Sequence, residues 1–155
     1  MENLLEQLLQ EEHELQFVSF NESTAWQIGC QLVERAQKDG LPITIDIARG
    51  SHQLFHASMP GTSTDNDEWI RRKVRLVSRF GHSSFYIGQL LKQKGKSIEE
   101  AYFIPEIDYA PHGGCFPVLV KNTGMVGTIT VSWLPQEEDH KLVIEAIRHY
   151  LAQEK

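Results

Sequence analysis

The segment that decides the fold runs from Asp46 to His82 and reads DIARGSHQLFHASMPGTSTDNDEWIRRKVRLVSRFGH. A β-rich run, Ile43–Ala48, leads into it, the residues Arg49-Gly50-Ser51 have the composition of a turn, and Gln53–Met59 form a second β-rich run. Two such runs separated by a short turn are typical of a β-hairpin. The sequence therefore predicts an antiparallel strand pair here.

After this hairpin, the same segment predicts a long helix. Pro60-Gly61 ends the second strand, because neither residue favours a continuing strand ladder. Asp65, with Glu68 three residues later, resembles a capping box, which marks the start of a helix. We expect the helix to run from Asn66 to about Phe80 and to end at Gly81, since glycine commonly terminates helices.

Outward from this segment, the same kinds of signal predict the remaining elements. We expect helices over Glu2–Glu14, from the cap Asn21 to Asp39, over Ser83–Lys94 and Ser97–Phe103, and from about Pro135 onward, and strands over Gln16–Phe20, Phe116–Lys121 and Met125–Trp133. Residues 104–114, IPEIDYAPHGG, are expected to form an irregular loop, and long irregular loops are often functional.

The order of these elements predicts the fold class. Hairpins imply a mainly antiparallel sheet, and amphipathic helices on either side of that sheet imply a layered α+β domain. A length of 155 residues is that of one ordinary domain with a substantial core. We therefore expect a single domain over residues 1–155.

Composition excludes several functional classes. With 41% hydrophobic and 23% charged residues, the chain is typical of a globular protein, and no apolar run approaches the roughly 20 residues that span a bilayer. The formal net charge is −6, whereas nucleic-acid binding needs a basic surface. The acidic N-terminal segment is not a signal peptide, and Cys30 and Cys115 form no Cys-x-x-Cys pair. We expect a cytoplasmic protein that binds neither nucleic acid nor membranes.

Five stretches carry a family resemblance: GLPITIDIARGSHQLF, ASMPGTSTDNDEWIRRK, RFGHSS, HGGCFPVLV and GMVGTITVSWLPQEEDH. They resemble the haem-degrading domain family, which includes the GlcG-like and HbpS-like proteins, and above all an uncharacterised branch of small bacterial and fungal proteins. The resemblance implies a profilin-like three-layer α/β/α sandwich with a five-stranded antiparallel sheet, assembled into homo-oligomers. Some members bind or degrade haem. This chain departs from the GlcG-like pattern at Ser132-Trp133-Leu134-Pro135, where those members carry Ser-Gly-Gly.

The histidines are the first candidates for chemistry. His52 and His56 lie four residues apart on one predicted strand and are expected to face the same side, roughly 13 Å apart. That separation is too large for one metal ion, and no histidine or cysteine spacing matches a dedicated metal site. Each of these histidines, like His82 and His112, is either a ligand-binding residue or a hydrogen-bonded residue of the sheet or of an interface.

The basic helix is the second candidate. Arg72, Arg75 and Arg79 recur at helical spacing and share one face of an otherwise acidic chain. Like charges at this spacing repel, so they need negative partners: carboxylates of the same chain, carboxylates of a neighbouring subunit, or a bound anion. His112-Gly113-Gly114 indicates either a close backbone approach to a ligand or a special turn.

No catalytic motif decides between three hypotheses. The first is an oligomeric small-molecule-binding protein, non-enzymatic or weakly catalytic; the second is a homo-oligomeric scaffold for protein partners; the third is an enzyme that acts on a small anionic substrate with a histidine as general base. Haem would require an axial histidine, from positions 52, 56, 82 or 112. For a small anionic ligand, the candidate pocket residues are Arg49, His52, His56, Arg72, His82 and His112.

Overall fold

The structure is a computed structural model that describes residues 3–154. The predicted start of the first helix at Glu2 lies outside the described residues. The elements are α1 (Leu4–Glu14), β1 (Gln16–Phe17), α2 (Glu22–Asp39), β2 (Thr44–Arg49), β3 (His52–Ser58), α3 (Thr64–Phe80), α4 (Ser84–Lys94), α5 (Ile98–Tyr102), β4 (Cys115–Val120), β5 (Gly124–Ser132) and α6 (Gln136–Gln153).

The five strands form one sheet in the order β1-β4-β5-β2-β3. The predicted hairpins β2–β3 and β4–β5 are both present, and β2 also pairs antiparallel with β5. The expectation of an antiparallel sheet is wrong at one edge, because β1 runs parallel to β4, with Gln16 opposite Leu119. Hairpins fix strand direction only for neighbours in sequence, whereas β1 reaches β4 from the far N-terminal end of the chain.

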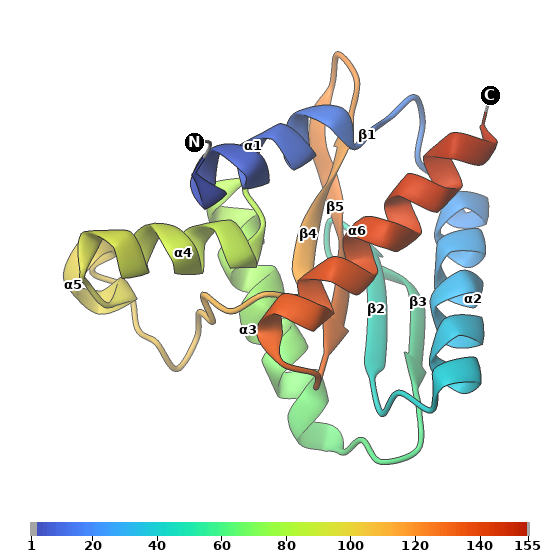
Figure 1. Cartoon of the computed structure of the whole chain (residues 1–155), viewed down its shortest axis with the longest axis horizontal. Coiled ribbons are helices and arrows are strands. Elements are labelled where there is room, and N and C mark those ends of the chain that lie inside the picture. Colours follow the sequence, from blue (N-terminus) through green and yellow to red (C-terminus); the bar gives the residue numbers. More distant parts are fainter. Residues whose placement is uncertain (1–2, 155) are drawn as a thin grey trace.

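The layers are those of the predicted α/β/α sandwich. Helices α2 and α6 cover one face of the sheet, α3 lies against the other, and α1, α4 and α5 extend the molecule to one side (Figure 1). The main apolar core lies between the sheet and the α2–α6 layer and includes the fully buried side chains of Phe17, Ile28, Ile45, Ile129 and Ile147. Within residues 3–154, no helix has the length and hydropathy needed to cross a membrane.

The sheet face under α3 differs from this core because it is polar and nonetheless buried. Alternation along β5 sends Ile129 and Val131 into the main core and Thr128, Thr130 and Ser132 to the opposite face. All three hydroxyl side chains are buried. A buried polar surface is costly unless its groups find partners, so it is a natural place to search for a binding site.

The start of α3 corrects one expectation. The helix begins at Thr64 with Ser63 as its N-cap, and the Ser63 N–H donates to Oδ1 of Asn66 at 2.8 Å. The predicted cap Asp65 lies inside the helix and is exposed. Asn66 is buried, so packing of its side chain selects this start among several polar residues that could each cap a helix.

The predicted irregular loop, residues 104–114, is tied to the helices beside it. The Ala110 N–H donates to the Arg72 carbonyl of α3 at 3.2 Å. On α4, Gly88 faces the Pro111 carbonyl so closely that a Cβ there would lie 2.2 Å from the oxygen. The absence of a side chain at Gly88 therefore lets the loop pack against α4 and fixes the position of His112.

We expect Gly88→Ala to destabilise the protein by about 1–3 kcal/mol, as overpacked sites do. Alanine normally stabilises a helix relative to glycine by roughly 0.5–1 kcal/mol, so the sign of the effect is diagnostic. Urea unfolding measures the change, with Gln93→Ala on the exposed face of α4 as a control that stays within about 0.5 kcal/mol of the wild type. A Gly88→Ala variant more stable than the wild type would contradict this packing.

Candidate functional site

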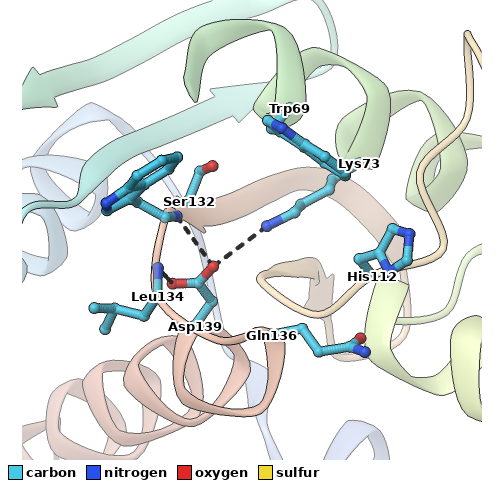
Figure 2. A pocket seen from close by; sticks show the side chains of 8 residues that line it. Trp69, Lys73, His112, Ser132, Leu134, Gln136 and Asp139 are labelled. Atoms are coloured by element: carbon cyan, nitrogen blue, oxygen red, sulfur yellow. Dashed lines mark hydrogen bonds and ion pairs between the residues drawn. The ribbon is translucent and has the colours of Figure 1, made fainter. Parts of the chain in front are cut away.

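A cavity of about 280 Å³ lies where α3, the 104–114 loop, the end of β5 and the start of α6 meet. Figure 2 shows Lys73 reaching from α3 toward Asp139 of α6, with Trp69 and His112 beside it. The residues that line the cavity are Trp69, Lys73, His112, Ser132, Trp133, Leu134, Gln136 and Asp139. We call this cavity the Lys73 pocket.

Its floor is a buried ion pair. Lys73 is 3% exposed and Asp139 1% exposed, and Nζ lies 3.5 Å from Oδ2. Nζ also donates to the Val131 carbonyl at 3.3 Å. The carboxylate accepts the backbone N–H groups of Trp133, at 3.2 Å, and Leu134, at 3.0 Å. Asp139 is therefore held in place by the backbone, whereas Lys73 is held only by two long contacts.

Burial brings the proton affinities of the pair closer together. Burial raises the pKa of Asp139 to about 6. The loss of water destabilises the carboxylate by more than Lys73 and the two backbone N–H groups stabilise it. It also lowers the pKa of the Lys73 ammonium, although Asp139 acts in the opposite direction. Transfer of a proton between these groups is thus easier than between the same groups in water.

The His-Gly-Gly sequence explains how the backbone closes over Lys73. A Cβ on Gly114, whose φ is +133°, would lie 2.7 Å from Lys73 Nζ and 2.3 Å from the Val131 carbonyl oxygen. A Cβ on Gly113 would lie 2.3 Å from the Gln136 carbonyl oxygen. The positive φ of Gly114 agrees with the predicted special turn, and both glycines let the loop pack closely against Lys73, the end of β5 and the start of α6.

Aromatic and amide groups form the walls of the pocket. The rings of Trp69 and His112 meet edge to face with centroids 5.6 Å apart, and the Arg72 guanidinium lies 4.6 Å from the Trp69 centroid. Gln136 accepts the Gly113 N–H through Oε1 at 3.0 Å, which leaves its NH₂ group for other acceptors. Burial, with the nearby charges of Lys73 and Arg72, lowers the pKa of His112, so its imidazole is neutral near pH 7.

The six predicted pocket residues do not line one cavity. His112 lines the Lys73 pocket, Arg72 lies over the ring of its wall residue Trp69, and His56 lines a second cavity of about 480 Å³ on the other side of α3. Arg49 pairs with Glu22 at 2.9 Å, His82 Nδ1 lies 2.7 Å from Glu12, and His52 is exposed. The structure thus distributes these residues over separate parts of the molecule.

The expectation that His52 and His56 face the same side is wrong. A register shift places His56 opposite Asp46 but Gln53 opposite Ala48, so the alternation of β3 is interrupted between them. Because the bulge inserts one extra residue into β3, two residues that lie four positions apart across it point to opposite faces of the sheet. His56 consequently lies between two carboxylates, with Nδ1 3.0 Å from Asp46 and Nε2 3.2 Å from Asp67.

The arginines of the basic helix contact groups of the same chain, but only some of these groups are carboxylates. Arg72 donates to the Glu106 carbonyl at 2.6 Å, and Arg75 pairs with Asp108 at 3.4 Å. Arg71 pairs with Glu68, and the Arg79 guanidinium lies 5.9 Å from the centroid of the Tyr109 ring. The predicted pairing with carboxylates of the same chain is therefore present for Arg75, whereas Arg72 and Arg79 contact a carbonyl group and an aromatic ring.

Sequence reasoning missed Lys73 and Asp139, which form the centre of the site. Lys73 has a signal, because it lies three residues after Ile70 and four before Val77, on the buried face of α3. A lysine on the apolar stripe of a helix is a candidate for a buried function. Asp139 has no such signal, since acidic residues are expected in the first turns of any helix.

Comparison with known proteins places this geometry in a family context. A family model described as haem-degrading protein HbpS-like matches residues 20–148. The UPF0303 protein of Psychromonas ingrahamii is 48% identical over 143 residues, which covers 92% of this chain and 90% of that protein. The crystal structure of the Ybr137w protein matches with a TM-score of 0.91 and 31% identity, over 99% of this chain and 91% of that one.

A structure of a PduOC:heme complex matches with a TM-score of 0.66 and 19% identity, over 84% of this chain and 92% of that one. At this level of identity the likeness is one of fold. The fold with its sheet and covering helices is therefore shared with a haem complex, while the residues of the Lys73 pocket have to be judged by their own chemistry.

The ion pair predicts a pH-dependent effect of Lys73→Met. In the wild type, folded Asp139 keeps its proton to about pH 6 whereas an ordinary aspartate loses it near 3.8, so this group's contribution to stability falls as pH rises through that window. Removal of the lysine charge raises the Asp139 pKa further and extends the fall above pH 6. We expect the loss of stability in Lys73→Met to grow by up to about 1.4 kcal/mol per pH unit between roughly pH 6 and 8.

Urea unfolding at several pH values measures this loss, and at about pH 8 it should approach the roughly 3–5 kcal/mol of a broken buried pair. Lys92→Met on the exposed side of α4 is the control, with a small change that is the same at each pH. A loss in Lys73→Met that is independent of pH would show that Asp139 does not retain a proton in the absence of the lysine.

Proposed function

The chain belongs to the HbpS-like haem-degrading protein family, and we propose that it binds a small, flat molecule bearing a carbonyl or carboxylate group in the Lys73 pocket. The observation that carries this proposal is a buried ammonium group placed beside an open cavity. Lysine has three N–H donors, and Val131 and Asp139 accept two of them. The third is available to an oxygen atom of a ligand.

The other groups of the pocket support a ligand of this kind. The Ser132 hydroxyl and the Gln136 amide add donors, and Trp69 supplies a flat apolar wall of the sort that packs against a planar ring. A few polar groups converging on an apolar wall are typical of small-molecule sites. Acidic Asp139 is already bonded to Lys73 and two backbone N–H groups, so it does not require a cationic ligand.

Haem does not fit this pocket. The volume of about 280 Å³ lies just below the roughly 300–1,000 Å³ of ordinary ligand pockets, and the floor is a charged pair rather than an apolar slot for a macrocycle. The larger cavity offers His56, but carboxylates contact both of its ring nitrogens, whereas an axial ligand needs one nitrogen for the iron. We therefore assign the pocket to a smaller ligand than haem.

We propose in addition that the protein works as a homo-oligomer in the cytoplasm. Phe103 and Ile107, four residues apart in the segment that follows α5, are 89% and 79% exposed. Large apolar side chains at this exposure favour burial against another surface, and most assemblies of soluble proteins are made of identical chains. The cysteines are both free thiols, which fits a reducing compartment.

Ligand binding is tested with benzoate, nicotinate and benzene-1,4-dicarboxylate as probes in thermal unfolding. A ligand at 100 times its Kd stabilises the folded state by about 2.7 kcal/mol, which raises Tm by roughly 5–10 °C for a chain of this size. Trp69→Leu should weaken binding by about tenfold or more, because a stacking wall is lost. Trp26→Leu, an exposed tryptophan on α2, is the matched control and should keep the response.

No rise in Tm with any of these probes, or an equal rise in Trp69→Leu, would refute the proposed site. Haem is titrated alongside them. A Soret shift that His112→Ala abolishes would show that haem does enter this pocket and would overturn its assignment to a smaller ligand.

Light scattering tests the assembly. We expect a mass of at least two chains, since the mass of one is 17.7 kDa. The double variant Phe103→Asn/Ile107→Ser should shift the mass toward one chain, and asparagine suits the positive φ of position 103. A wild-type mass of 17.7 kDa at micromolar concentration would contradict the homo-oligomer; an unchanged mass in the double variant would remove these two residues from the interface.

A further inference from the structure

We propose that Lys73 forms a reversible imine with an aldehyde or ketone group of the ligand, an inference that rests on the ligand site proposed above. This assigns to the pocket a covalent capture of carbonyl compounds, with Lys73 as the nucleophile and Asp139 as the group that moves protons. Neither role follows from the family description or from the fold.

The position of the amine carries the inference. Nζ faces the cavity from the end of a side chain that is otherwise enclosed by α3 and the His-Gly-Gly loop. Its contacts to Val131 and Asp139 are 3.3 and 3.5 Å long, near the limit of a hydrogen bond, so the amine gives up little when it turns to a carbonyl carbon. Asp139 remains in place because the N–H groups of Trp133 and Leu134 hold its carboxylate.

Burial also favours the product. An ammonium group that is 3% exposed is penalised by the loss of water, whereas a neutral imine is not. The same penalty lowers the pKa of Lys73 and so increases the fraction of neutral amine that is able to attack. The neutral imidazole of His112 and the flat ring of Trp69 line the space in which the carbonyl compound would lie.

The reaction is balanced without any further reagent. The Lys73 ammonium first transfers a proton to Asp139, which leaves a neutral amine beside a carboxylic acid. The lone pair of Nζ then forms a bond to the carbonyl carbon and the C=O π electrons move to oxygen. Asp139 protonates that oxygen and takes a proton from the nitrogen, which gives a carbinolamine and restores the carboxylic acid. The C–O bond then breaks and the oxygen, protonated by Asp139, leaves as water. The nitrogen lone pair forms C=N, and the N–H proton returns to the carboxylate. The sum is amine plus carbonyl giving imine plus water, with no oxidation or reduction.

The experiment uses 4-formylbenzoate, a flat aromatic aldehyde with a carboxylate, and traps any imine with cyanoborohydride. Peptide mass spectrometry then locates the reduced adduct. We expect one adduct per chain at Lys73, formed faster than at exposed Lys92, because the lowered pKa of Lys73 increases its fraction of neutral amine and the pocket holds the aldehyde beside Nζ. Lys73→Arg keeps the positive charge but has no nucleophilic amine, and it should lose this adduct. Lys92→Arg should retain it.

Benzene-1,4-dicarboxylate separates this inference from the binding site itself, because it has the same shape without an aldehyde. If the dicarboxylate raises Tm but 4-formylbenzoate labels Lys73 no faster than Lys92, the binding site stands and the imine is refuted. If neither probe changes Tm and Lys73 is not labelled, both proposals fail. An adduct that persists at another lysine in Lys73→Arg, at the wild-type rate, also overturns the assignment.

Discussion

The buried contact between Lys73 and Asp139 is the constraint on which the site depends. It joins α3, on one face of the sheet, to α6, on the other, around the end of β5. Two opposite charges removed from water are tolerated only when they are paired and hydrogen-bonded, and the backbone around them satisfies this requirement. Trp133 accordingly takes a φ of +128°, unusual for a residue with a side chain, in the turn that offers its N–H to the carboxylate.

The polar face of the sheet gives this pair its surroundings. An ordinary sandwich buries apolar residues on both faces of its sheet, but here Thr128, Thr130 and Ser132 lie beneath α3. Cavities flank the helix, one beside Lys73 and one beside His56. Polar groups can pack in fewer ways than apolar groups, because their hydrogen bonds are directional. A polar layer therefore leaves cavities that a close-packed apolar core would fill. The apolar core on the other face supplies the stability that permits this arrangement.

Three histidines of the chain are partners of carboxylates. Glu12 of α1 bonds to His82, which raises the pKa of that histidine, and Glu11 lies 2.9 Å from His140. His56 bridges two aspartates. These contacts attach α1 to the rest of the molecule and join the hairpin to α3. His112 differs from them because it lies at a cavity beside cations, where neutrality is favoured.

The sequence by itself determined the helices, both hairpins and the layered architecture, because these follow from caps, turns and periodicities that act over a few residues. The capping of α2 by Asn21 and its end at Gly40 are local in this sense. Only the tertiary structure decided the parallel pairing of β1, the bulge that separates His52 from His56, and the meeting of Lys73 with Asp139. Lys73 and Asp139 lie 66 positions apart, and although Lys73 stands out on the buried face of α3, nothing local in the sequence identifies Asp139 as its partner. Burial shifts the proton affinity of a charged group, and burial depends on which distant segments close over it.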